Sequence, residues 1–197
     1  MNRTTDREAQ EPDDGTLAAR ALAGSEDACR MLMQRHRDGI YRLVRAQIED
    51  ADAALDVTQE SFIAAFANLH RYDLARPFRH WIVRIAINKC RDWRRRRAVR
   101  AFFTRARPLE EGLAVADTEP GPDAQVQGRH ELARVRKAID ALPEGLRSVL
   151  LLRAVAGMSQ LEVAGILGIT AKAVETRLYR ARAKLTEILR ESPGPRV

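Results

Sequence analysis

Apolar residues recur three, four or seven positions apart along almost the whole chain, which is the spacing of one face of an α-helix. Alternating runs of β-branched residues, which are typical of strands, do not occur in the sequence. The pattern predicts helices at about residues 25–48 and 52–69, a third from Pro77, and further helices from about residue 130 onward. We therefore expect an all-α fold.

The first two predicted helices differ in what they expose. Ser25, followed by two acidic residues, is a suitable N-cap for the first helix, whose expected apolar stripe is Met33, Ile40, Tyr41, Val44 and Ile48. The second has a stripe of Leu55, Phe62, Phe66 and Leu69, and its other face carries Asp56, Gln59, Glu60 and Ile63. The polar residues alone fit a solvated face equally well. The apolar Ile63 among them favours a surface that binds a partner.

The third predicted helix is strongly basic. The segment HRYDLAR (70–76) interrupts the helical pattern, and Pro77 suits a first helical turn because its missing N–H is not needed there. If the apolar Phe78, Trp81, Ile82 and Ile85 face a core, another side presents Arg79, Asn88, Arg91, Arg94 and Arg95. Basic side chains beside a loop that contains Tyr72 are typical of a groove that follows a nucleic-acid backbone and has a place to stack or pocket a base.

A helix-turn-helix pattern lies near the C-terminus. After a helix at about 130–141 and another from Pro143 to Gly157, Ser159 and Glu162 fit a capping box for a short helix. Gly168 suits a turn, and Thr170 suits the cap of a longer basic helix. That helix has an inward stripe of Val174, Leu178, Ala181 and Leu185, and it presents outward Lys172, Glu175, Thr176, Tyr179 and Arg180, with Arg177 and Lys184 at the flank. Such a helix reads base edges in the major groove; a purely structural three-helix bundle is the alternative.

Helical periodicity fades between these two basic parts of the chain. The stretch PLEEGLAVADTEPGPDAQVQG (108–128) has the Pro, Gly and acidic content of a linker. We predict two small helical domains joined by a flexible linker, with a disordered tail at 1–24, domains at 25–99 and 129–190, the linker at 100–128 and a tail at 191–197. The adjacent Phe102 and Phe103 have no role that the pattern assigns.

The distribution of charge along the chain supports this division into two domains and a linker. The net charge is +7, yet residues 71–107 contain thirteen Lys and Arg against two Asp, a net +11, while 108–128 sum to −5. Basic charge concentrated in two segments predicts defined phosphate contacts and salt-sensitive binding, with adhesion to a membrane surface as the alternative.

Other features of the sequence narrow the class of protein. No apolar run approaches the roughly 20 residues that span a bilayer, and the N-terminal residues lack the apolar core of a secretory signal, so we expect a cytoplasmic protein. Cys29 and Cys90 are isolated and fit buried thiols better than a disulfide or a zinc site. We find no catalytic constellation, so an enzyme is the least supported class.

Three segments, in this order, resemble bacterial sigma factors of the extracytoplasmic-function (ECF) type. DVTQESFIAAFANL (56–69) is similar to the family's core-polymerase-binding helix, and PFRHWIVRIAINKCRDWRRRR (77–97) is similar to its −10-element helix. LPEGLRSVLLLRAVAGMSQLEVAGILGITAKAVETRLYRARAKL (142–185) resembles its −35-element helix-turn-helix. The similarity covers roughly residues 28–189.

The resemblance implies a role for each candidate residue. Core RNA polymerase would bind Asp56, Gln59, Glu60 and Ile63. The −10 element would be bound and melted by Tyr72, Arg76, Arg79, Asn88, Arg91, Arg94 and Arg95, and the −35 element would be read by Lys172, Glu175, Thr176, Arg177 and Arg180. The implied partners are the polymerase, promoter DNA and an anti-sigma factor, with no cofactor, no metal and no direct insertion into a membrane.

Some positions depart from the family pattern. The first helix of the turn motif has Leu161, Glu162 and Val163 where many relatives have an aromatic residue followed by an acidic-isoleucine-alanine step, and the second starts with Ala171, Lys172 and Ala173 where Gly-Thr is common. The promoter sequence therefore does not follow from the resemblance. Two other functions stay open, a DNA regulator with an unrelated N-terminal sensor and an adaptor that mimics a sigma factor and sequesters an anti-sigma factor without binding DNA.

Overall fold

The computed structural model describes residues 11–105 and 123–191, and every regular element within those ranges is helical. The elements are α1 (Asp14–Leu22), α2 (Glu26–Arg45), α3 (Ala51–Ala67), the 3-10 turn η1 (Leu69–Arg71), α4 (Phe78–Arg105), α5 (Asp123–Asp140), α6 (Glu144–Ala154), α7 (Gln160–Leu167) and α8 (Ala171–Glu191). The prediction of helices is confirmed for this part of the chain. None of these helices is both long and apolar enough to cross a membrane.

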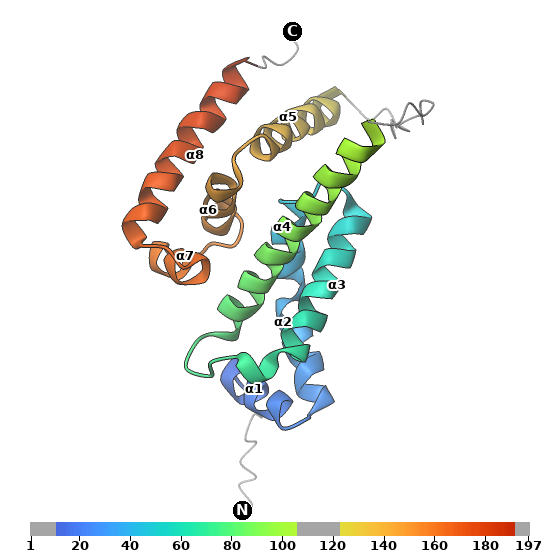
Figure 1. Cartoon of the computed structure of the whole chain (residues 1–197), viewed down its shortest axis with the longest axis vertical. Coiled ribbons are helices and arrows are strands. Elements are labelled where there is room, and N and C mark those ends of the chain that lie inside the picture. The colour runs from blue at the N-terminus through green and yellow to red at the C-terminus, as the bar shows by residue number, and fades with distance from the viewer. Residues whose placement is uncertain (1–10, 106–122, 192–197) are drawn as a thin grey trace, which may run out of the picture.

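The helices form two groups that lie side by side (Figure 1). Helices α1–α4 pack together as the N-terminal bundle, and α5–α8 pack together as the C-terminal bundle. The long α4 lies along the side of the N-terminal bundle that faces α6 and α7 (Figure 1). Residues 106–122, most of the predicted linker, lie outside the described residues.

Helix boundaries correct several predictions. Residues 14–22, which we expected in a disordered tail, form α1, in which Leu17 and Ala18 have no exposed surface. The signal for this helix was the stretch from Leu17 to Ala23, which is apolar except for Arg20. Residues 100–105 continue α4 and residues 123–128 begin α5, so both ends of the predicted linker are helical.

Small residues decide which face of α3 is buried. Ala54, Ser61 and Ala65 are fully buried beside Val57 and Phe62, because small side chains let α3 approach α2 and α4 closely. The hydroxyl of Ser61 donates to the Val57 carbonyl at 2.6 Å, which satisfies it inside the core. Because the stripe was predicted from large apolar residues alone, it was wrong for the exposed Leu55, as it was for Met33 on α2.

Phe78, in the first turn of α4, anchors that helix in the N-terminal bundle. It follows Pro77 as predicted and is fully buried, with its ring against those of Phe66, Tyr72 and His36. Cys90, on the same helix, is also fully buried, and burial raises the pKa of its thiol to about 12. The prediction of a buried thiol is therefore confirmed for Cys90, while Cys29 is half-buried, and both are free cysteines.

The C-terminal bundle closes around α6. Its core contains Val149, Leu151, Leu152, Met158, Val163 and Val174. Helix α6 ends at Ala154, three residues before the predicted C-cap, and Gly157 instead takes a positive φ of 64° in the turn that leads to α7. On α5, Leu132 is 51% exposed.

Candidate nucleic-acid interface

Helices α7 and α8 form a helix-turn-helix, and its local geometry follows from the residues that the pattern singled out. Ser159 and Glu162 form the capping box, with the Ser159 N–H donating to the Glu162 carboxylate at 2.6 Å. Gly168 adopts the left-handed conformation (φ 65°, ψ 38°), and the Thr170 hydroxyl caps α8 by accepting from the Ala173 N–H at 3.1 Å. These predictions are confirmed. In addition, the Gln160 amide donates to the Ala171 carbonyl at 2.7 Å and joins the starts of the two helices.

The outward side of α8 presents most of the residues predicted to read DNA. Lys172, Glu175 and Arg180 are exposed, and Tyr179 is 75% exposed. Thr176 is half-buried on the same side, while Val174 and Ala181 on the opposite side have no exposed surface, as the stripe predicted.

Arg177 takes a different position from its neighbours. Its side chain is half-buried, and a guanidinium nitrogen lies 3.6 Å from where a Cβ on Gly145 of α6 would stand. The absence of a side chain at Gly145 leaves room for the guanidinium beside the start of α6. Arg177 therefore lies at the edge of the outward face, packed along α6.

The acidic face of α3 is accessible. Asp56 and Gln59 are exposed, Glu60 contacts Lys89 of α4 at 3.3 Å, and Ile63 is 61% exposed. A single exposed aliphatic side chain is ordinary on a protein surface, so Ile63 supports a binding surface only together with the other exposed apolar residues of α2 and α3, Met33 and Leu55.

A groove continues this face between α2 and α3. It is lined by Met33, Arg37, Asp38, Tyr41, Leu55, Thr58, Gln59 and Phe62. The pattern did not predict the exposed apolar part of the groove, because Met33 and Leu55 had been assigned to the core. The available signal was the run of small residues on α3, whose burial turns Leu55 outward.

Tyr72 does not offer a surface for stacking a base. Only 7% of it is exposed, its hydroxyl donates to the Arg76 carbonyl, and its ring packs edge-on against Phe78 at 5.7 Å between centroids. Of the two ways in which this loop could receive a base, stacking on the Tyr72 ring is not supported, because the ring is buried in the core; a pocket for the base stays a prediction. Tyr72 instead holds the loop before α4 in place.

Three of the predicted −10 residues, Arg76, Asn88 and Arg95, lie on the surface of the described part of the chain. Arg76 pairs with Asp73 at 3.2 Å and Arg95 pairs with Asp92 at 3.0 Å, and in each pair both side chains are at least half exposed. Asn88 is exposed and lines a small hollow with Arg84, Arg91, Ile87, Ile166 and Leu167. These groups are accessible to a ligand.

The other three arginines, Arg79, Arg91 and Arg94, contact the C-terminal bundle. Arg91 lies 3.2 Å from the Glu144 carboxylate and 3.4 Å from the Ser148 hydroxyl of α6. Arg94 pairs with Asp140 at the end of α5 and also donates to the Gln47 carbonyl at 3.0 Å. Arg79 donates to the Ala156 carbonyl in the turn after α6.

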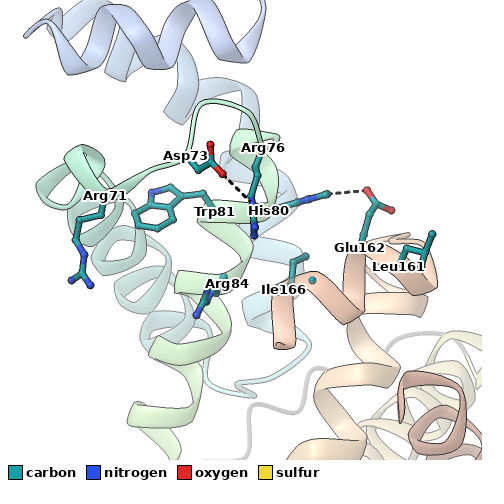
Figure 2. Close-up of a pocket in the computed structure, with 10 residues that line it drawn as sticks. Arg71, Asp73, Arg76, His80, Trp81, Arg84, Leu161, Glu162 and Ile166 are labelled. Atoms are coloured by element: carbon teal, nitrogen blue, oxygen red, sulfur yellow. Dashed lines mark hydrogen bonds and ion pairs between the residues drawn. The ribbon is translucent and has the colours of Figure 1, made fainter. Parts of the chain in front are cut away.

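A fourth contact joins the bundles through α7. The His80 ring lies 2.9 Å from the Glu162 carboxylate, at the edge of a cleft of about 660 Å³ (Figure 2). The cleft is lined from the N-terminal bundle by Arg71, Asp73, Arg76, His80, Trp81 and Arg84, and from α7 by Leu161, Glu162, Gly165 and Ile166. No local pattern in the sequence predicts this juxtaposition, because it joins residues about 80 positions apart.

Acidic residues of the C-terminal bundle stay ionised at this boundary. Burial alone would raise the pKa of Glu144, but the Ser148 hydroxyl and the guanidinium groups of Arg147 and Arg91 outweigh it and lower that pKa. The pKa of Glu162 falls to about 2, because the Ser159 N–H and hydroxyl hold its carboxylate and His80 adds to the effect. The two carboxylates therefore present negative charge to α4.

Known proteins match this chain along nearly its whole length. The family description "Sigma-70 region 2" matches residues 32–100, and "Sigma-70, region 4" matches residues 132–185. RNA polymerase sigma factor CnrH of Cupriavidus metallidurans is 44% identical over 180 residues, which are 89% of this chain and 94% of that protein. ECF RNA polymerase sigma factor SigW of Bacillus subtilis is 32% identical over 174 residues, 85% of this chain and 92% of that protein.

A solved structure of a sigma factor has a similar fold. The structure of CnrH in complex with the cytosolic domain of CnrY superposes with a TM-score of 0.67 and 36% sequence identity, over 91% of this chain and 99% of that one. The two matched regions contain the basic helix α4 and the helix-turn-helix, in the order that the sequence predicted. This chain therefore belongs to the sigma-70 family of RNA polymerase sigma factors, among the ECF type.

Proposed function

We propose that this sigma factor binds core RNA polymerase through the exposed face of α3, opens and binds the −10 element along α4, and reads the −35 element with α8. The observation that carries the proposal is the order of three distinct surfaces on one chain. An acidic face with an exposed isoleucine precedes a basic helix, and a helix-turn-helix follows. Each surface suits a different ligand.

The α3 face suits a basic protein partner. Asp56, Gln59 and Glu60 supply polar and negative groups, and Ile63 with Leu55 of the adjoining groove supplies apolar area. A desolvated apolar centre with a polar rim is the usual composition of a binding hot spot.

The α4 face suits DNA that is being opened. Arg76, Arg79, Arg91, Arg94 and Arg95 would neutralise phosphates, and Asn88 offers an amide to an unpaired base. Because Tyr72 is buried, it would shape the loop that receives a base and would not stack on it. Melting then depends on the loop and the basic helix acting together.

The α8 face suits duplex DNA. Lys172, Glu175, Thr176 and Arg180 lie one and two turns apart on the outward side, which lets them meet successive base pairs and phosphates in the major groove. Arg177 reaches the same groove from the edge of that face.

Control by an anti-sigma factor is part of the proposal. The relative CnrH was solved bound to the cytosolic domain of CnrY, and a similar partner for this chain would cover surfaces that polymerase or DNA needs. Action on polymerase and promoter places the protein in the cytoplasm.

Reconstituted transcription tests the proposal. Core polymerase, a pool of genomic promoter fragments and the full chain should yield start sites that require the protein, and their alignment defines the promoter. An absence of initiation, together with tight binding to an anti-sigma protein, would establish the sequestering adaptor in its place.

The polymerase-binding face is tested by charge reversal. Asp56→Lys leaves the Glu60–Lys89 pair intact and should abolish binding to core polymerase without changing the thermal unfolding of the chain. Glu187→Lys, an exposed charge reversal on α8, is the matched control. Retained binding by Asp56→Lys would remove α3 from the polymerase interface.

A further inference from the structure

We propose that Asp14 and His36 are positioning residues for opening of the −10 element. They support from behind the η1–α4 loop (residues 72–77), which receives a base in the proposed function. The inference deepens that function and rests on it, since the function assigns a base to this loop. It gives α1, which the sequence pattern did not predict, a task in promoter opening beyond its contribution to the core.

The start of α1 is tied to α2 through one carboxylate. Asp14, in the first turn of α1, accepts a hydrogen bond from the Arg35 guanidinium at 2.8 Å, and its second oxygen lies 2.7 Å from Nε2 of His36. Arg35 also donates to the Pro12 carbonyl at 3.0 Å. The His36 side chain is only 12% exposed. Its contact with the carboxylate therefore fixes the orientation of a ring that is already enclosed by its neighbours.

The His36 ring carries this support to the first turn of α4. Its centroid lies 5.4 Å from that of Phe78, which has no exposed surface. The Phe78 and Tyr72 rings meet edge to face at 5.7 Å between centroids, and Tyr72 donates its hydroxyl to the Arg76 carbonyl. A line of contacts thus runs from Asp14, through three rings, to the backbone of the loop.

A second observation places the start of α1 close to this loop. Helix α1 contacts η1 and α4 as well as α2, at the end of the N-terminal bundle where the loop lies (Figure 1). Burial raises the pKa of the Tyr72 hydroxyl, and the negative charges of Asp14 and Asp73 raise it further. The Asp14 charge therefore acts on Tyr72 and helps to keep its hydroxyl protonated, as the donor to the Arg76 carbonyl requires.

The hydrogen bonds of the loop itself are local. In the part of the chain that the structure describes, they join residues at most four positions apart. The Ala75 N–H donates to the Asp73 carboxylate at 3.0 Å, and the Arg76 N–H donates to the Asp73 carbonyl at 3.0 Å. Such bonds set the shape of the turn but do not attach it to the bundle. Its position beside α4 depends on Tyr72 and on the rings that support Tyr72.

A fixed loop matters most for the opening step. Taking a base out of the duplex costs unpairing and unstacking energy, and a site that is already in place offsets more of that cost than a site that must first be ordered. Loss of the support therefore slows opening of the −10 element. Binding to core polymerase and to the −35 duplex stays unchanged, because neither of those proposed surfaces includes α1 or the loop.

Promoter opening by the full chain with core polymerase tests the inference. The promoter recovered from the transcription assay carries a fluorescent adenine analogue in its −10 element, whose emission rises when the base leaves the stack. Asp14→Ala removes the contacts with His36 and Arg35 and should open the promoter about threefold to tenfold more slowly, the effect of one lost hydrogen bond. Asp27→Ala is the matched control, because it removes an acidic residue of the first turn of α2 whose partner, Arg30, lies on the same helix.

Two further measurements separate positioning from a general loss of structure. A promoter whose −10 element is already mismatched should remove most of the defect of Asp14→Ala, because the unpairing energy is no longer needed. The conservative variant Asp14→Asn, whose amide keeps a hydrogen bond to His36, should recover most of the opening rate. Helix content by circular dichroism and the affinities for core polymerase and the −35 duplex should equal those of the control.

The outcomes separate this inference from the proposed function. Equal opening rates for Asp14→Ala and Asp27→Ala overturn the positioning role, and so does a defect that is the same on the mismatched promoter. If Asp14→Ala loses helix content, His36→Leu replaces it, since leucine keeps an apolar contact with Phe78 and loses the pair with Asp14. Slower opening by His36→Leu then supports the inference, and an unchanged rate overturns it. These results leave the proposed function standing, whereas no opening by the unmodified chain overturns both.

Discussion

Replacing Ile63 with alanine should weaken binding to core polymerase while leaving the fold intact. Full burial of an isoleucine side chain stabilises by about 1.5–3 kcal/mol. Since Ile63 is 61% exposed in the free chain, burying the remainder against the polymerase is worth at most roughly 1–2 kcal/mol, or about 5- to 30-fold in Kd. Because most of Ile63 is already in water in the free chain, replacing it with alanine removes little buried apolar area and should hardly change the stability of the fold.

The assay is titration of a labelled full chain with core polymerase, accompanied by thermal unfolding of each variant. Leu132→Ala is the matched control, because Leu132 is 51% exposed on a helix of the other bundle. An unchanged polymerase affinity for Ile63→Ala would refute the assignment of this face. A loss of stability in the range of about 2–5 kcal/mol, typical of buried aliphatic residues, would refute the reasoning from exposure.

Three further predictions concern DNA reading, the core and acid stability. If Arg177 contacts a base, Arg177→Ala should weaken binding to the −35 duplex recovered from the transcription assay by about 1–3 kcal/mol. Gel-shift titrations measure this loss, and the control Arg182→Ala, at an exposed position of the same helix, should lose less affinity. Equal losses for the two variants would make Arg177 a phosphate contact. Leu17→Ala should lower the free energy of unfolding in urea by about 2–5 kcal/mol, because Leu17 is fully buried; a negligible change would mean that α1 is not part of the core. Because the folded-state pKa of Glu162 is lowered to about 2 from 4.5, its stabilisation is complete above pH 4.5 and is lost as pH falls toward 2. The stability difference between wild type and Glu162→Gln, followed by urea unfolding against pH, should therefore shrink over that range, and a constant difference would contradict the shift.

Local structural features could be predicted from the sequence because they depend only on residues that are neighbours along the chain. The capping box of Ser159 and Glu162, the left-handed Gly168 and the start of α4 after Pro77 each follow from backbone chemistry within a few positions. The inward stripe of α8 follows from helical periodicity for the same reason. The two-domain division stays a prediction.

The buried side of α3 and the position of Tyr72 could not be predicted from the sequence. Which face of a helix is buried depends on how closely its neighbours approach, and Ala54 and Ser61 permit an approach that turns Leu55 outward. From the sequence alone, Tyr72 could lie either at the surface or in the core. The contacts of its ring with those of Phe78 and Trp81 show that it lies in the core.

The sequence by itself determined that this protein is helical, that its net positive charge is concentrated in two segments and that its C-terminal part is a helix-turn-helix, since these depend on periodicity, composition and short-range capping. Only the tertiary structure decided that Arg91 and Arg94 of one basic helix meet Glu144 and Asp140 of the other bundle. Side chains about 50 residues apart become neighbours through the packing of whole helices, and no local pattern encodes that distance.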